Sequence, residues 1–250
     1  MQPTEHVLEV WGELACFTRP ELKVERFSYP VITPSAARGI LDAIYAKPNR
    51  DPTQAEFRWE VTSIEVLNPP KYLALRRNEV KEKVSESNVK QWMRGNGEPQ
   101  PIFADADKSL TGSDAKGRTQ RQTMALKDVR YRIHARAKPW PGHKRKQPAI
   151  DAQFQRRASQ GKCFYQPCFG CREFPAYFEL VEPDAPLPDG AWRKNMDVGL
   201  MLYDVFDLSR PGTCESKPAV SLFHAKVEAG RLTVPPYESD QVLRLEGGLG

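Results

Sequence analysis

The sequence predicts an α+β fold dominated by antiparallel strands. Several segments alternate apolar and polar residues at period two, which is the strand repeat. Two segments have the apolar spacing or the capping residues of helices. The 22 prolines among 250 residues indicate many loops and short strands rather than a helical bundle. Aromatic residues make up 10% of the chain, which is typical of a folded protein.

The N-terminal third contains a strand, a helix and a strand pair. "HVLEVWGELACF" alternates as a strand does. A helix is predicted to begin at Pro34 and Ser35 and to stop before Pro48, with an Ile/Leu stripe toward the core. "FRWEVTSIEVLN" and "KYLALRRNEV" are expected to pair with each other across a proline turn.

The rest of the chain predicts an insertion, a second helix and a C-terminal sheet. Residues 81–120 are polar and rich in Gly and Asp, which indicates an inserted loop or hairpin. A short helix is expected to start with Asp151 as N-cap and to end at Gly161. We expect a first domain over 1–185 and a small C-terminal β-sheet domain over 186–250.

Positive charge is concentrated in one part of the chain. Fourteen Lys or Arg and two acids lie between Lys116 and Lys162, a net charge of +12 in a chain whose total is +5. Such polarisation favours a polyanionic partner, above all nucleic acid. The alternative is a solvated, salt-tolerant surface.

The strand "VRYRIHAR" places its cations on one face. Val129, Tyr131, Ile133 and Ala135 alternate with Arg130, Arg132, His134 and Arg136. Same-face neighbours on a strand are about 7 Å apart, so these like charges repel unless an anion neutralises them. An RNA or DNA backbone would do so, and so would acids on the neighbouring strands.

The three cysteines in "GKCFYQPCFGCREFPA" do not form a recognisable metal or redox site. Cys168 and Cys171 make one C-x2-C pair, but the sequence contains no second pair of ligands. A strand-like segment follows them, whereas a redox C-x-x-C opens a helix. Phosphate-binding loops, nucleophile elbows and clustered metal-binding acids are also missing from the sequence, and no metal or other cofactor is predicted.

A metal-free nuclease is restricted to RNA, because the 2′-hydroxyl of RNA can itself attack the neighbouring phosphodiester. Such a site needs a base for the 2′-hydroxyl, a cation for the phosphorane and an acid for the leaving 5′-oxygen. Tyr, His, Lys and Arg suit these roles, and they are concentrated in the basic half of the chain.

Two long blocks closely resemble the CRISPR-associated Cas5 family of subtype I-C, also called Dvulg. They are "FTRPELKVERFSYPVITPSAARGILDAIYAKP" and "FQRRASQGKCFYQPCFGCREFPAYFE". The resemblance implies the ferredoxin-like (RRM-like) fold of the RAMP superfamily, with an inserted β-hairpin and a small C-terminal β-sheet domain. It implies a metal-independent endoribonuclease that cuts CRISPR repeat RNA, leaves a 2′,3′-cyclic phosphate and a 5′-hydroxyl, and stays bound to the crRNA within the type I-C interference complex.

The resemblance also implies site residues. The family's active-site tyrosine in I-Y-x-K-P matches Tyr45, which spacing alone would assign to the edge of the core. The family's Lys-His pair would fall at Ala149 and Ile150, and the nearest equivalent is His143-Lys144. Tyr45 would then act on the 2′-hydroxyl, Lys144 or Lys47 would stabilise the phosphorane, and His143 would protonate the 5′-oxygen. The predicted RNA-binding residues are Arg38, Arg130, Arg132, His134, Arg136, Arg145, Lys146, Arg156 and Arg157, although Arg156 and Arg157 also suit a helix C-terminus without any ligand.

Two rival functions remain open on the sequence. One is a non-catalytic RNA-binding scaffold subunit, and the other is general binding of duplexes, including double-stranded DNA, through the +12 segment. No window of eighteen apolar residues predicts a membrane span, and the N-terminus does not resemble a secretory signal. The odd number of cysteines favours a reducing cytoplasm.

Overall fold

The computed structural model describes residues 4–22, 24–46, 56–99, 101–104, 107–113, 115–141, 147–212 and 216–244. The chain divides into two compact units. The first unit comprises Met1–Leu73 and Met124–Gly250, and the second comprises Ala74–Thr123.

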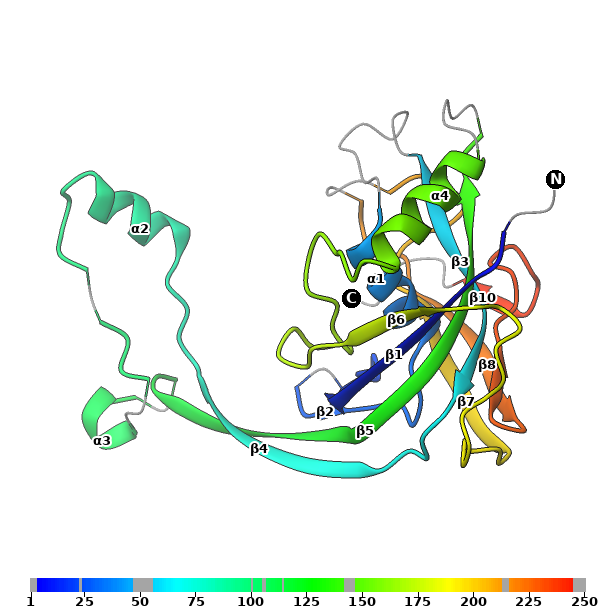
Figure 1. The fold of residues 1–250 in the computed structure, drawn as a ribbon. Coiled ribbons are helices and arrows are strands. Elements are labelled where there is room, and N and C mark those ends of the chain that lie inside the picture. The colour runs from blue at the N-terminus through cyan, green and yellow to red at the C-terminus, as the bar shows by residue number, and fades with distance from the viewer. Residues whose placement is uncertain are drawn as a thin grey trace. The chain divides into compact units, whose positions relative to one another are not determined.

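The first unit is a curved antiparallel sheet with two helices (Figure 1). Its path of paired strands runs in the order β10-β8-β9-β3-β5-β1-β6, with β7 paired to β8 and β2 paired to β5. Its elements are β1 (His6–Ala15), β2 (Arg26–Phe27), α1 (Pro34–Ile44), β3 (Phe57–Val66), α4 (Gln147–Ala158), β6 (Tyr177–Val181), β7 (Met196–Asp204), β8 (Ser221–Glu228), β9 (Arg231–Thr233) and β10 (Val242–Arg244), together with part of β5 (Arg118–Pro139).

Helix α1 forms where the sequence predicts it. Thr33 caps it by accepting a hydrogen bond from the N–H of Ala36 at 3.2 Å, and Pro34 occupies the first turn, where a missing N–H costs nothing. Ile40, Leu41 and Ile44 are fully buried. The predicted helix and its Ile/Leu core face are therefore confirmed.

Helix α4 begins at Gln147, so the prediction that Asp151 is its N-cap is wrong. Asp151 lies one turn inside the helix, and its carboxylate accepts hydrogen bonds at 3.0 Å from His6 Nε2 and from Gln147. Phe154 packs edge-on against the rings of His6 and Trp59, so α4 covers the same sheet face that α1 covers. Gly161 has a φ of 63° in the turn that follows the helix, a conformation that favours glycine.

The expected pairing of residues 57–68 with residues 71–80 is also wrong. The first segment is β3, which pairs with β5 and β9, whereas β4 (Tyr72–Val80) pairs with β5. Strand β5 is 22 residues long and can therefore serve both β3 and β4 as a partner. The apolar alternation of β3 and of β4 predicts that each is a strand, but it does not reveal that both pair with a third strand far away in the sequence.

The second unit contains α2 (Glu86–Met93), α3 (Lys108–Thr111) and the remaining parts of β4 and β5 (Figure 1). Neither helix has a buried residue. Ser85 and Asp107 cap the two helices through their side chains. The N–H of Lys81 donates to the carbonyl of Gly117 at 2.9 Å, so the two ends of this polar segment lie next to each other.

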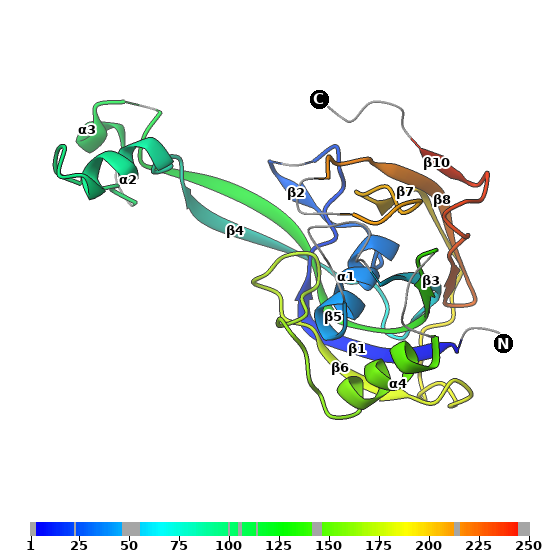
Figure 2. The same cartoon turned by 90° about the horizontal axis from the view of Figure 1, so that it is seen from above.

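The C-terminal strands join the first unit, so the structure does not divide at the expected boundary near residue 185. β9 pairs with β3 over Ser63–Glu65, and β8 pairs in turn with β9, β7 and β10. Figure 2 shows β7, β8 and β10 together on the side of this unit opposite α4. In the part of the chain that the structure describes, no helix is long and apolar enough to span a membrane.

Candidate functional site

Tyr45 stands at the C-terminal end of α1. Its N–H donates to the carbonyl of Leu41 at 2.9 Å, and its backbone is extended, with a φ of −151°. Trp59 Nε1 donates to the Tyr45 carbonyl at 2.8 Å, and the Tyr45 ring lies 5.3 Å from the ring of Phe57. The side chain is 1% exposed. Tyr45 is therefore packed into the protein interior.

The C-terminal end of α4 meets α1 beside Tyr45. Arg157 Nε donates to the carbonyl of Ile44 at 2.7 Å, and its guanidinium lies 3.9 Å from the centre of the Phe164 ring. The N–H of Phe164 donates to the carbonyl of Ala43 at 2.7 Å. Two backbone carbonyls at the end of α1 thus hold α4 and the following loop in place.

Some predicted residues fall near this place and others lie outside the described residues. Arg156 is exposed one residue before Arg157 and donates to Gln153 at 2.7 Å. The remaining predicted catalytic residues Lys47, His143 and Lys144, and the predicted RNA-binding residues Arg145 and Lys146, lie outside the part of the chain that the structure describes. Among the predicted site residues that the structure describes, Arg157 is thus the one that it holds beside Tyr45, at the carbonyl of Ile44.

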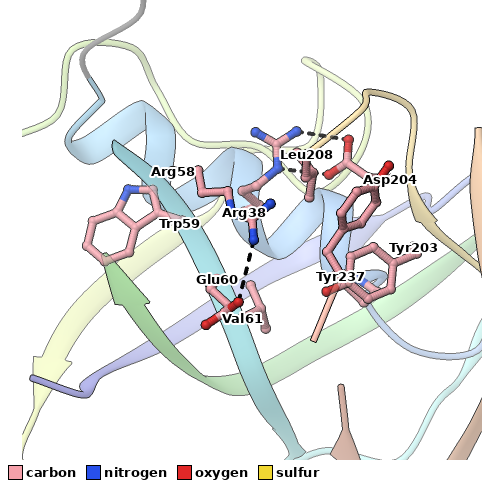
Figure 3. Close-up of a pocket in the computed structure, with 10 residues that line it drawn as sticks. Arg38, Arg58, Trp59, Glu60, Val61, Tyr203, Asp204, Leu208 and Tyr237 are labelled. Atoms are coloured by element: carbon pink, nitrogen blue, oxygen red, sulfur yellow. Dashed lines mark hydrogen bonds and ion pairs between the residues drawn. The ribbon is translucent and has the colours of Figure 1, made fainter. Parts of the chain in front are cut away.

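Arg38 lies in a half-buried ion-pair network in which Asp204 is fully buried. Its guanidinium donates to both carboxylate oxygens of Asp204, at 2.8 and 3.0 Å, and to Asp42 at 2.9 Å. Figure 3 shows Arg38 of α1 turned toward Asp204 of β7. The cavity that they line has a volume of about 10 Å³, about the space that one water molecule needs. This geometry assigns Arg38 a role in attaching α1 to β7.

The cations of β5 face carboxylates on the strands beside them. We call this set the charged face: Glu5, Glu9, Glu65, Arg130, Arg132, His134 and Arg136. Glu9 pairs with Arg130 and, at 2.8 Å, with Arg132. Arg132 also donates to the carbonyls of Ala185 and Pro186 at 3.0 and 2.9 Å. Intramolecular acids already neutralise these cations, so their charge by itself requires no RNA.

His134 is buried between two acids of the charged face. Its Nε2 lies 3.5 Å from Glu65 and its Nδ1 lies 3.9 Å from Glu5, at ion-pair distance but outside hydrogen-bond geometry. The His134 imidazole, together with Arg231 and Arg132, lowers the pKa of Glu65, against the opposing effect of burial. Glu65 therefore stays ionised well below neutral pH.

Two cysteines from distant parts of the chain are in contact. Cys16 and Cys171 are both buried, and Arg26 Nη1 lies 3.4 Å from the Cys171 sulfur. Hydrogen bonding to Cys171 lowers the pKa of Cys16 to about 7, and the same contact raises the pKa of Cys171. The described residues hold no group of three or more His, Cys, Asp or Glu side chains placed to bind a metal ion.

Two exposed aromatic residues near Tyr45 were not predicted as candidate site residues from the sequence. Phe164 and Tyr165 are 53% and 78% exposed, and both follow the C-terminal turn of α4. Their signal was an adjacent aromatic pair just after Lys162, within a stretch without acids from Ala152 to Arg172.

The sequence matches known families and proteins over nearly its whole length. A family model described as "CRISPR-associated protein (Cas_Cas5)" matches residues 7–235. A protein from Mannheimia succiniciproducens is 40% identical over 242 residues, covering 95% of this chain and 97% of the relative. One from Thermus thermophilus is 40% identical over 253 residues, covering 96% of each. Both relatives are named CRISPR pre-crRNA endoribonuclease Cas5d.

Solved structures share the fold. The crystal structure of a CRISPR-associated protein matches with a TM-score of 0.60 at 20% identity, over 96% of each chain. A functionally uncharacterized protein from Streptococcus mutans matches with a TM-score of 0.61 at 18% identity, over 96% of this chain and 97% of that one. At these identities the likeness concerns the fold alone, and the family rests on the sequence matches. The chain belongs to the CRISPR-associated Cas5 family.

Proposed function

We propose that this protein is an endoribonuclease that cleaves CRISPR repeat transcripts into crRNA. The observation that carries the proposal is the 40% identity, over at least 95% of the chain, to two relatives named pre-crRNA endoribonucleases. The net charge of +12 between Lys116 and Lys162 suits a polyanionic substrate.

The cleavage site that we propose lies around Tyr45, at the C-terminal end of α1. Tyr45 positions or deprotonates the 2′-hydroxyl, which attacks the neighbouring phosphorus and expels the 5′-oxygen. A cation stabilises the phosphorane, and Lys47 and Lys144 are the candidates for this role. His143 donates the proton to the leaving oxygen. The products are a 2′,3′-cyclic phosphate and a 5′-hydroxyl, and no step uses a metal ion.

The proposed role of Tyr45 as a base depends on the pKa of its hydroxyl. An ordinary tyrosine has a pKa near 10, so Tyr45 is a weak base at neutral pH unless cations depress that value. Arg157 is held at the neighbouring carbonyl of Ile44, and Lys47 follows Tyr45 by two residues. Positive charge from these residues would favour the phenolate and the phosphorane alike.

We propose a ferredoxin-like frame, as in RRM domains, for the part of the fold that carries the site. The support is the element order β1-α1-β3-β5-α4-β6 and the antiparallel strand order β3-β5-β1-β6. This is the βαββαβ arrangement with its two helices on one face. In such a frame both helices lie on the side of the sheet where Tyr45 ends α1.

We further propose that the protein stays bound to its RNA product as a subunit of the type I-C interference complex. The family match over residues 7–235 supports this assignment. Retention of the product predicts a slow, single-turnover reaction, because the crRNA end remains on the enzyme.

The test compares wild type with Tyr45→Phe on the cognate repeat RNA. The variant keeps the ring that packs against Phe57 and loses the hydroxyl. We expect cleavage to fall by at least a hundredfold while the affinity for RNA stays within about threefold. The wild-type protein should not cleave a substrate that has a single 2′-deoxynucleotide before the scissile phosphate. Full activity of Tyr45→Phe would remove Tyr45 from the site, and cleavage of the 2′-deoxy substrate would contradict 2′-hydroxyl attack.

A further inference from the structure

The loop after α4 is anchored beside Tyr45 by its backbone. Lys162 N–H donates to the carbonyl of Arg157 at 2.9 Å, and the Phe164 and Tyr165 N–H groups approach the carbonyl of Ala43 at 2.7 and 3.4 Å. Ala43 precedes Tyr45 by two residues. The place of both aromatic residues is therefore fixed relative to the proposed cleavage site.

The side chains of this loop remain accessible although their backbone is held. Tyr165 is 78% exposed and Phe164 is 53% exposed. Phe164 stacks on the Arg157 guanidinium at 3.9 Å, which holds that cation beside the end of α1. An isolated exposed aromatic residue needs no explanation, but an adjacent pair on an anchored loop beside a fixed cation is an unusual surface.

The charge around the pair suits a nucleic acid. Arg156, Arg157 and Lys162 lie within nine residues of Tyr165, and no Asp or Glu occurs between Ala152 and Arg172. Single-stranded RNA is held by aromatic rings that stack on its bases and by cations that follow its phosphates. Both requirements are met on this loop.

A second exposed aromatic pair provides the contrast. Trp11 and Tyr177 stack with ring centres 6.3 Å apart on neighbouring strands of the sheet. The groove beside Trp11, of about 480 Å³, is lined by Glu13, Asp128 and Glu179, with Arg130 as its one cation among the described lining residues. Glu9 already pairs with that cation. Carboxylates repel a phosphate backbone, so this pair serves as a control.

We propose that Tyr165, which follows Phe164 on this anchored loop, stacks on an unpaired base of the repeat RNA next to the scissile phosphate. The proposal rests on the proposed cleavage of repeat RNA and names a residue that positions the substrate. Stacking on Tyr165 would fix the nucleotide whose 2′-hydroxyl faces Tyr45. The hydroxyl of Tyr165 has no part in this role.

The experiment measures binding without cleavage. The probe is repeat RNA with 2′-deoxynucleotides at all unpaired positions and 2-aminopurine at one of them in turn. The proteins are wild type, Tyr165→Ala, Tyr165→Phe and the control Tyr177→Ala. We expect wild type to quench one probe position, Tyr165→Ala to lose that quenching and about tenfold in affinity, and Tyr165→Phe and Tyr177→Ala to behave like wild type.

Each outcome decides the proposal. Equal quenching and affinity in Tyr165→Ala would overturn it, and so would loss of binding in Tyr165→Phe, because the ring alone should suffice. An effect of Tyr177→Ala as large as that of Tyr165→Ala would show nonspecific stacking and also overturn it. Because the probe cannot be cleaved, stacking would survive a failure of wild type to cut the natural repeat, whereas the proposed endoribonuclease function would not.

Discussion

Arg132, a predicted nucleic-acid contact, has carboxylate and carbonyl partners within the protein. Period two correctly places Arg130, Arg132, His134 and Arg136 on one face of β5. The acids that neutralise them come from residues about 120 positions earlier in the chain and from β3. Strand register is a non-local property, so the local pattern predicts the face but not the partners. Whether these cations bind RNA stays a prediction.

Replacing Arg132 with Met should destabilise the protein more than it weakens RNA binding. The change leaves the buried Glu9 with one guanidinium and removes two hydrogen bonds to the 185–186 carbonyls, at a cost of about 3 kcal/mol. Arg156→Met, at an exposed position, should change stability by less than about 0.5 kcal/mol. Urea unfolding and RNA filter binding measure the two effects. If Arg132→Met loses RNA affinity while its free energy of unfolding stays unchanged, Arg132 contacts RNA and does not mainly stabilise the fold.

Glu65 should make the stability depend on acid pH. Its folded-state pKa is lowered from 4.5, with His134 as the largest cause. Its ionised form therefore contributes stability that is complete above pH 4.5 and is lost as the pH falls through the folded-state pKa. The difference in free energy of unfolding between wild type and Glu65→Gln should shrink as the pH falls below 4.5. A difference that is constant or grows on acidification would contradict this coupling.

At the scale of elements, α1 was predictable and the strand pairing was not. The Ile/Leu stripe of α1 and its prolines are local signals, whereas the 22-residue β5 takes partners from three other strands of the first unit and from β4. The start of α4 was misplaced because Asp151 has the side chain of a cap but serves as the partner of buried His6. Burial of that pair overrides the capping preference of aspartate.

The segment between β4 and β5 should be dispensable for folding of the first unit. Its two helices bury no residue, and Lys81 and Gly117 are already joined by a backbone hydrogen bond. Replacing residues 82–116 with Asn-Gly should therefore leave a hairpin turn between β4 and β5. We expect the melting temperature of the shortened protein within about 5 °C of wild type by calorimetry. Failure to fold would show that the segment stabilises the rest of the chain.

At the scale of the whole molecule, two long sequence blocks identified the family, and the matches to named relatives support an RNA partner more directly than the charge count does. The burial of Tyr45 could not be predicted from the sequence. Its burial follows from the packing of Phe57 and Trp59, which β3 brings to the end of α1. The position of Tyr165 near Tyr45 could not be predicted from the sequence either, because Ala43, whose carbonyl its N–H approaches, lies more than a hundred residues earlier in the chain.

The most direct test of the account is cleavage of the cognate repeat RNA by wild type in excess EDTA, with analysis of the product ends. We expect cleavage at one position at the same rate as with magnesium, leaving a 2′,3′-cyclic phosphate and a 5′-hydroxyl. Loss of cleavage in EDTA with recovery on adding magnesium would contradict the metal-independent mechanism. Tight binding without cleavage under either condition would make the protein an RNA-binding scaffold instead.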